Sequence, residues 1–330
     1  NDPDNHGGLL SQNVVSAIVQ LIDNGNFATR QLGVCALCNL SCSEAAYVSV
    51  AEDSMDCLIR TMQMASMGME TRMNAMKAVC NLVVFYEPAR KLAVDGDLVP
   101  ALGTMLKLLS DEEEKMIMAK IMRAISFYND GHVTIQDSKG MNILLRLSKL
   151  ENAELKSDVS IALLNLSTCM FQNQLVEDGI IEAIFWLTLQ DLLGLTKPVF
   201  ERCSAVVRNL TKNEKTLGRV VLEDKLMTVL KKMADFDNDF VKFNACISLY
   251  NISCYGDSQD LMVRHGIINT IVGLAEAGIS KMRSICSAAL HQYPQELLKD
   301  SKIIAILMSL LSMYTCVMDD TEVTIKENSS

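Results

Sequence analysis

Aromatic residues are scarce in this sequence. Phe, Trp and Tyr together make up 5% of the 330 residues, and there is a single Trp, whereas hydrophobic residues of all kinds make up 49%. A β-sandwich fills its core with aromatic and β-branched side chains, so this composition favours helices packed through Leu, Ile, Val, Ala and Met. The composition therefore predicts an all-α protein.

Positive charge is also in deficit. The chain has 30 Lys and Arg against 40 Asp and Glu, and its net charge is −10. No block of Lys and Arg is dense enough to neutralise a run of phosphates, so we expect no nucleic-acid partner. No apolar run approaches the roughly 18 residues that cross a bilayer, and residues 1–8 are polar, so we expect neither a membrane span nor a signal peptide.

Known catalytic motifs are missing as well. The four histidines, His6, His132, His265 and His291, lie far apart, and the sequence has no phosphate-binding glycine loop and no G-x-S-x-G motif. We therefore predict a protein that is not an enzyme and that needs no cofactor or metal.

Cysteine is plentiful but scattered. The eleven cysteines are odd in number and lie in apolar stretches, which is typical of small core residues in a reduced protein. Cys35, Cys38 and Cys42 have a spacing that could bind zinc or an iron–sulfur cluster in a loop, but they fall on a predicted helix without further ligands nearby. We expect a cytoplasmic protein, with the cytoskeleton or a cilium as candidate sites of attachment.

The chain repeats itself with a period near 42 residues. A motif of a small residue, two variable residues, Asn, an apolar residue and often Ser or Thr recurs along the sequence, for example in residues 36–41 and 162–167. Two degenerate copies, at residues 124–128 and 289–293, fill the remaining places. The signature positions are then Asn39, Asn81, Phe127, Asn165, Asn209, Asn251 and Gln292, separated by 42, 46, 38, 44, 42 and 41 residues. Such periods are typical of stacked repeats.

A second signature follows most copies. A Gly stands before a new apolar run at Gly96, Gly179 and Gly266. Glycine has the backbone freedom to end one helix and to turn tightly into the next. The apolar residues that follow recur at helical spacing, so each repeat is expected to contain amphipathic helices that share a core with their neighbours.

The two signatures together resemble the armadillo repeat, in which a short helix and two longer helices form one unit. The resemblance implies a right-handed α-solenoid of about seven armadillo-like repeats over residues 27–315. It also implies that a polar N-terminus and a capping helix form residues 1–26. Residues 316–330 are expected to be a polar tail.

In the armadillo family, the last helix of each repeat lines a concave groove in which Asn side chains hold the main chain of an extended peptide. Carried over position by position, together with the residues four and seven places before the signature, the resemblance gives a set of candidate groove residues. These are Asn39, Asn74, Lys77, Asn81, Lys120, Arg123, Phe127, Asn165, Arg202, Asn209, Asn244 and Asn251.

Lys77, Lys120 and Arg123 make the second and third repeats basic, which favours an acidic or phosphorylated partner segment. The resemblance therefore implies a scaffold or adaptor that binds proteins through an extended, acidic segment. The other interpretation of the asparagines is that they hydrogen-bond within the repeats themselves.

Nuclear-import receptors of the family have a Trp four residues before each groove Asn. This chain has Cys35, Lys77, Ile161, Ala205 and Ile247 at those places, which argues against that function. Two alternatives stay open: a regulator of a folded partner such as a small GTPase or a motor protein, and a structural element that assembles with copies of itself. The sequence leaves the oligomeric state undetermined.

Overall fold

The computed structural model describes residues 13–189, 197–277 and 280–293. All regular secondary structure in these ranges is helical. The helices of the first half are α2 (Val14–Asn24), α3 (Phe27–Leu40), η2 (Glu44–Ala46), α4 (Tyr47–Gln63), α5 (Met69–Phe85), α6 (Pro88–Asp95), α7 (Leu98–Leu106), α8 (Glu112–Ser126), α9 (Asn129–Asp137), α10 (Met141–Ser148), α11 (Ala153–Leu166), α12 (Gln172–Glu177) and α13 (Ile180–Leu189). Those of the second half are α14 (Lys197–Lys212), α15 (Glu214–Val220), α16 (Leu226–Asp235), α17 (Asp239–Ser253), η3 (Gly256–Ser258), α18 (Gln259–Arg264), α19 (Ile267–Ala277) and α20 (Ser280–Leu290).

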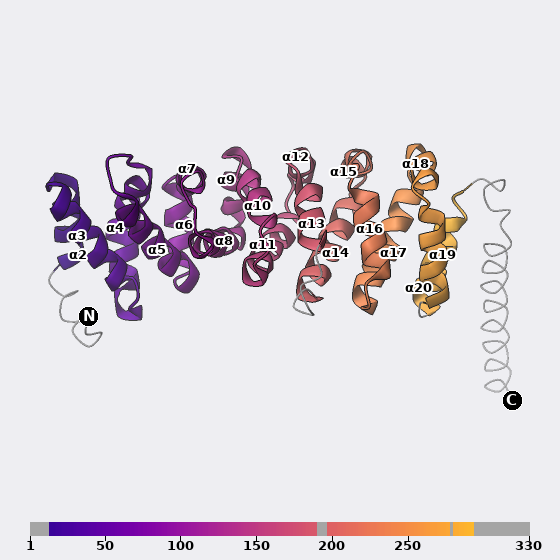
Figure 1. Cartoon of the computed structure of the whole chain (residues 1–330), viewed down its shortest axis with the longest axis horizontal. Helices are drawn as coiled ribbons and strands as arrows, with labels where there is room; N and C mark the ends of the chain where they lie inside the picture. Colours follow the sequence, from indigo (N-terminus) through magenta and orange to yellow (C-terminus); the bar gives the residue numbers. More distant parts are fainter. Residues whose placement is uncertain (1–12, 190–196, 278–279, 294–330) are drawn as a thin grey trace, which may run out of the picture. The chain divides into compact units, whose positions relative to one another are not determined.

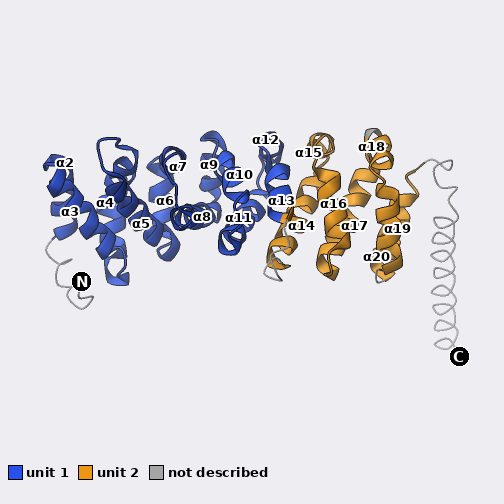
Figure 2. Cartoon of the chain, in the orientation of Figure 1, with its two compact units in different colours: residues 1–187 blue, residues 188–330 orange. Residues whose placement is uncertain are grey.

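The chain divides into two compact units, residues 1–187 and 188–330 (Figure 2). The sequence did not indicate this division. In unit 1 the helices that carry the repeat signature, α3, α5, α8 and α11, pack in succession, and we call them the third helices (Figure 1). The second helices α2, α4, α7 and α10 pack in a parallel row, and the short first helices α6 and α9 are also in contact. Unit 2 repeats this arrangement with α14, α17 and α20 as third helices and with α16 against α19.

Local sequence accounts for the helix boundaries. Asp111 caps α8, and Glu114 reaches back to the backbone of Asp111, which completes a capping box within the acidic segment at residues 111–114. Gly179 and Gly266 adopt positive φ angles of 94° and 66°, as the second signature predicts. At the corresponding turn after α6 the positive φ of 60° belongs to Asp97 rather than to Gly96.

The core is built from Leu, Met, Ile, Val and Ala, as the composition predicts. Its largest fully buried side chains include Leu37, Leu58, Met76, Leu102 and Met122. No single helix in the described ranges has the length and apolar character of a membrane span. The pair formed by residues 27–40 and 44–63 passes that test jointly, by length and composition, and is bent by 116°. The predicted tail, residues 316–330, and residues 1–12 of the predicted N-terminal segment lie outside the described residues, whereas α2 lies within that segment.

The structure corrects the register of the third repeat. A fully buried Ser, whose hydroxyl donates to the carbonyl three residues earlier, follows the signature position by two residues at Ser41, Ser167 and Ser253. Ser126 makes the same bond, which places Ala124 at the signature position. Ala124 is buried, whereas Phe127, placed there by the sequence alignment, is 57% exposed. The spacings become 42, 43, 41, 44, 42 and 41 residues, which are more even than predicted.

Candidate functional site

The third helices of each unit form a continuous surface, the third-helix face. In the corrected register Lys77 on α5 and Lys120 on α8 both precede the signature position by four residues. Arg123 precedes it by one residue, and Arg208 on α14 has the same place in unit 2. The predicted residues Lys77, Asn81, Lys120 and Arg123 therefore lie on neighbouring helices, because α5 packs against α8.

Two of the signature asparagines brace adjacent repeats. Asn81 Nδ2 donates to Ser41 Oγ at 3.1 Å, and Asn165 Nδ2 donates to Ser126 Oγ at 3.0 Å. Each bond joins one third helix to the end of the third helix before it. Asn81 Nδ2 also donates to Cys42 Sγ at 3.4 Å, so Asn81 keeps its carbonyl oxygen for a ligand, whereas Asn165 keeps a second N–H and its carbonyl oxygen. Both residues are partly exposed. The two interpretations of the asparagines are therefore compatible.

The other predicted groove asparagines of the third helices differ in their surroundings. Asn39 is exposed, and its amide reaches Cys35 Sγ at 3.9 Å. Asn74 and Asn209 are partly exposed on α5 and α14. The Nδ2 atom of Asn251 is buried and has no hydrogen-bond partner among the described residues. The asparagines therefore differ in exposure and in hydrogen bonding, and they do not form a row of equivalent amides.

Two of the three predicted cations in unit 1 are already paired. Lys120 Nζ lies 2.9 Å from Glu154 Oε1, and Arg123 Nη1 lies 2.9 Å from Asp158 Oδ1. Both carboxylates belong to α11, the next third helix. Lys77 is exposed and forms no ion pair with a described residue.

Asp158 is the most buried member of this charge cluster. Its side chain is 5% exposed, and its Oδ2 atom has no hydrogen-bond partner in the described part of the chain. Burial raises the pKa of this carboxyl, although Arg123 and Lys120 act in the opposite direction. Ionisation of Asp158 in the folded protein therefore costs free energy, and the ion pair with Arg123 offsets only part of that cost.

Phe127 lies at the end of α8, three residues beyond the signature position. The guanidinium carbon of Arg90, on α6, stands 5.9 Å from the centre of its ring. Arg90 is held in place because its Nε donates to the carbonyl of Val83 at 3.0 Å. Phe127, a predicted groove residue, is therefore an exposed aromatic side chain three residues beyond the signature position rather than at it.

In unit 2 the structure overturns one predicted site residue. Asn244 is fully buried, its Nδ2 donates to Ser204 Oγ at 2.9 Å, and its Oδ1 accepts from Arg208 Nη1 at 3.1 Å. A side chain in this position cannot contact a partner, so the prediction for Asn244 was wrong. Its place in the repeat is that of Asp158, which accepts from Arg123 in the same way.

The positive charge of the unit 2 third helices was missed by the sequence analysis, apart from Arg202. Their basic residues are Lys197, Arg202, Arg208, Lys212, Lys242, Lys281 and Arg283, against the acidic residues Glu201 and Asp239. The signal was present in the sequence, but only the places four and seven residues before the signature were considered. An α-helix has 3.6 residues per turn, so side chains at other positions of the repeat also reach the surface.

Two of these cations are well placed to meet a ligand. Lys281 is exposed, and its Nζ lies 5.2 Å from the centre of the Phe243 ring. Lys242 is partly exposed on α17. Neither forms an ion pair with a residue that the structure describes.

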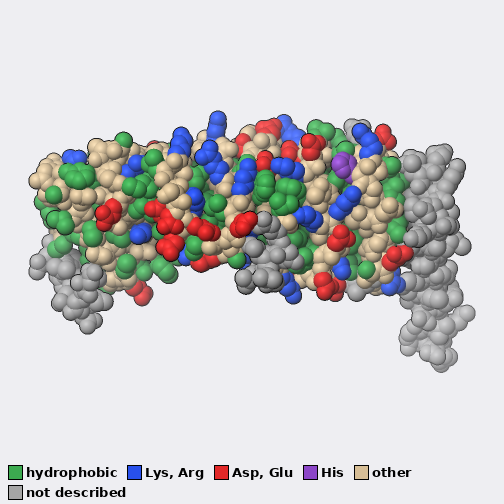
Figure 3. Space-filling view, in the orientation of Figure 1, with side chains coloured by type: hydrophobic (Ala, Val, Ile, Leu, Met, Phe, Trp, Pro, Cys, Tyr) green, Lys and Arg blue, Asp and Glu red, His purple; other side chains and the backbone are tan. Residues whose placement is uncertain are grey.

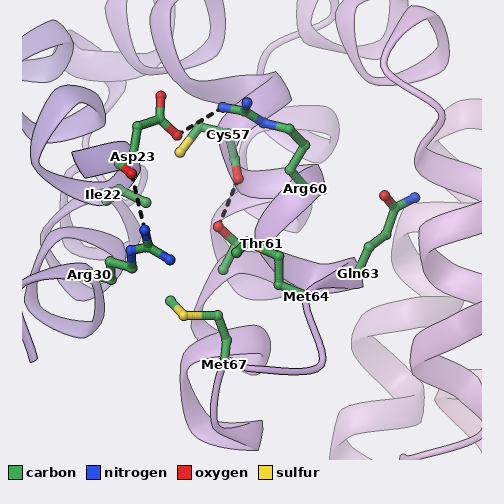
Figure 4. A pocket seen from close by; sticks show the side chains of 9 residues that line it. All are labelled: Ile22, Asp23, Arg30, Cys57, Arg60, Thr61, Gln63, Met64 and Met67. Carbon is green, nitrogen blue, oxygen red and sulfur yellow. Dashed lines mark hydrogen bonds and ion pairs between the residues drawn. The ribbon is translucent and has the colours of Figure 1, made fainter. Parts of the chain in front are cut away.

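A cavity of about 370 Å³ near the start of unit 1 contains two arginines (Figure 4). Arg60 Nη2 lies 3.0 Å from Asp23 Oδ1. Arg30 donates through Nε to the carbonyl of Gly25 at 3.0 Å and through Nη2 to that of Asp23 at 3.1 Å. Both arginines already donate hydrogen bonds to carboxylate or carbonyl oxygens within the chain, so this cavity is a weak candidate for an anion-binding site.

The cysteines show no sign of a metal centre. No group of three metal-ligating side chains occurs among the described residues. Burial raises the pKa of the Cys38 thiol to about 11 and that of Cys80 to about 12, so both stay protonated near neutral pH. All ten cysteines in the described ranges are free.

Comparisons with known proteins agree with the repeat architecture. No protein-family model and no curated protein sequence matches the chain. Among solved structures, an engineered protein (target OR497) is 18% identical over 94% of this chain and 81% of its own, with a TM-score of 0.61. Computationally designed armadillo repeat proteins for modular peptide recognition are 14% identical over 73% of this chain and 100% of theirs, with a TM-score of 0.58. A designed armadillo repeat protein in complex with the peptide (KR)4 is 13% identical over 73% and 100%, with a TM-score of 0.55.

Proposed function

We propose that this chain, which has the armadillo-repeat fold, is a non-enzymatic scaffold that holds an extended acidic segment of a partner protein on its third-helix faces. The observation that carries the proposal is the set of cations without a carboxylate partner among the described residues: Lys77 in unit 1, and Lys242 and Lys281 in unit 2. Lys77 and Lys242 lie on the same helices as the signature asparagines Asn81 and Asn251, and Lys281 lies on α20, the last third helix. Its many free cysteines suit the reducing cytoplasm, where we place its activity.

The amides and the cations have different tasks in this mechanism. The amide carbonyl oxygens of Asn81 and Asn165, and the second N–H of Asn165, hydrogen-bond to the peptide main chain, whatever its sequence. The lysines select acidic side chains by electrostatic attraction, which mainly raises the association rate and specificity. Lys120 and Arg123 contribute less to selection than the sequence suggested, because Glu154 and Asp158 neutralise them.

Some solved structures with this fold support the first part of the proposal. One was designed for modular peptide recognition, and another is a complex with the basic peptide (KR)4. For this chain the unpaired lysines favour a ligand of the opposite charge. A scaffold of this kind needs no cofactor.

The experiment compares a fluorescein-labelled Glu-Gly repeat peptide with a Lys-Gly peptide by fluorescence anisotropy. We expect the acidic peptide to bind more tightly, and Lys77→Glu or the double variant Lys242→Glu, Lys281→Glu to weaken binding by about tenfold. Lys215→Glu is the matched control, since Lys215 is exposed on α15, which is not one of the third helices. Equal affinity for the two peptides, or equal losses in the control, would refute the proposal.

A further inference from the structure

Unit 1 contains a second region of unpaired positive charge, on a different surface from the third helices. A cavity of about 480 Å³ lies between α7 and the segment formed by the end of α9 and by α10. Its lining residues are Val99, Pro100, Gly103, Thr104, Leu106, Lys107, Ser138, Lys139, Asn142, Ile143 and Arg146. Blue side chains gather over α7, α9 and α10 in Figure 3. The second helices α7 and α10 thus provide two of its walls.

The lining is rich in hydrogen-bond donors and has no carboxylate. Lys107, Lys139 and Arg146 are exposed, and none forms an ion pair with a described residue. The side chains of Ser138 and Asn142 make no hydrogen bond within the described part of the chain. Three cations without an ion pair to a described residue therefore surround one cavity, although the net charge of the chain is −10. On the third-helix face of unit 1, by comparison, Lys120 and Arg123 are paired with carboxylates and Lys77 is not.

The backbone fixes these donors in place. Lys139 adopts a positive φ of 54° at the turn between α9 and α10. The turn is held by hydrogen bonds from the Lys139 amide to the carbonyl of Gln136 at 3.0 Å and from the Asn142 amide to that of Lys139 at 3.1 Å. Ser138, Lys139 and Asn142 are therefore presented from one ordered turn and the start of α10. The cation of Lys107 faces them from the end of α7.

We propose that this cavity binds the phosphoryl group of a phosphorylated segment of a partner protein. A phosphate dianion is the ligand that several cations and neutral donors satisfy together, and a guanidinium such as that of Arg146 can bind it with two parallel hydrogen bonds. The site does not depend on the third-helix face and can be occupied independently of it.

The apolar part of the lining identifies the kind of molecule that carries the phosphate. Val99 and Ile143 are buried beneath the polar rim, and Leu106 lies beside Lys107. An apolar side chain next to the phosphorylated residue can pack there, whereas an inositol headgroup is polar on every side. The lining includes no aromatic ring on which a nucleotide base could stack, so a nucleotide is a poor fit.

The test measures binding of a fluorescein-labelled peptide of Ala, Val and Gly with one central phosphothreonine, and of its unphosphorylated copy, by anisotropy on the full chain. We expect only the phosphorylated peptide to bind, and the variant Lys107→Glu, Arg146→Glu to weaken it by about tenfold or more. Lys91→Glu is the control, because Lys91 is exposed on α6 outside the cavity. Thermal unfolding followed by circular dichroism checks that each variant is folded.

Two further measurements make the outcome decisive. The variant Ser138→Ala, Asn142→Ala removes donors without changing charge, and it is expected to weaken the phosphopeptide while leaving the acidic peptide of the third-helix face unaffected. Phosphatidylcholine vesicles with and without phosphatidylinositol bisphosphate test the lipid alternative. Binding to the doped vesicles without preference for the phosphopeptide would overturn the proposal, as would phosphopeptide binding that survives the Lys107→Glu, Arg146→Glu changes.

Discussion

Arg123 on α8 donates to Asp158 on α11 across 2.9 Å, and the same two places in unit 2 hold Arg208 and Asn244, whose side chains are 3.1 Å apart. In both cases an arginine one residue before the signature position binds the residue seven places before the next signature. One junction between third helices in each unit therefore uses the same contact, which is an ion pair in unit 1 and a hydrogen bond to a neutral acceptor in unit 2. The difference leaves more uncompensated positive charge on unit 2.

The burial of Asp158 predicts a pH-dependent stability. Its pKa is raised above the ordinary value of about 4, so ionising it in the folded state is less favourable than in the unfolded chain. As the pH rises from about 4 to 7, the wild type should lose unfolding free energy relative to Asp158→Asn, which has no charge to ionise. Urea unfolding of the two proteins across this range gives the difference directly. A difference that stays constant with pH would contradict the prediction.

The brace between Asn81 and Ser41 predicts a loss of stability on truncation. Asn81→Ala removes a 3.1 Å hydrogen bond between two repeats, so the free energy of unfolding should fall by about 1 kcal/mol. Asn39→Ala is the control, since its amide contacts a sulfur atom at 3.9 Å, and its effect should stay within about 0.5 kcal/mol. Equal effects in urea denaturation would show that the brace contributes nothing specific.

Gly131, in the first turn of α9, is required by close packing. A Cβ atom at this position would collide with the carbonyl oxygen of Ile125. Gly131→Ala should therefore destabilise the protein by about 3 kcal/mol or more, because backbone must move. A Cβ atom added to Gly103 in α7 would meet no other atom within 4 Å, so Gly103→Ala should raise the free energy of unfolding by about 0.5–1 kcal/mol. Thermal melts that rank the two substitutions in the opposite order would disprove this account.

The thiols should react in an order set by exposure and by pKa. Cys35, Cys42 and Cys254 are exposed, whereas Cys80 is buried and burial raises its pKa to about 12. Iodoacetamide attacks the thiolate, so peptides containing the exposed cysteines should be modified first and Cys80 only after denaturation. Mass spectrometry of a time course measures this order. Modification of Cys80 at the rate of Cys42 would mean that α5 opens readily.

Much of the fold could be predicted from the sequence because the recurring motif reveals the length of the repeat. The signature around Asn39, Asn81 and Asn165 marks the C-terminal part of each third helix, and the structure confirms all-α armadillo-like repeats. The exception is the third repeat. There the sequence aligned Phe127 by the shape of the motif, whereas packing selects Ala124, since a small residue fits the buried place and the large aromatic ring stays outside.

The candidate site was harder to predict, since the fate of each side chain depends on its neighbours in the next repeat. The sequence placed Lys120 and Arg123 on the last helix of a repeat but could not show that Glu154 and Asp158 neutralise them. The repeat pattern predicted Asn244 as a partner-binding residue because it stands seven residues before the signature position. In the structure its side chain is fully buried and donates to Ser204 on the preceding third helix.

The sequence by itself determined the helical class, the repeat period and the identity of the residues along each third helix, because these depend on local patterns within one chain segment. The tertiary structure decided which charges are paired and which remain available. It also brought Lys107, Lys139 and Arg146 around one cavity, although they lie on three different elements. Ion pairing and cavity formation depend on distances between residues some 30 to 40 positions apart, and those distances are fixed only when successive repeats pack.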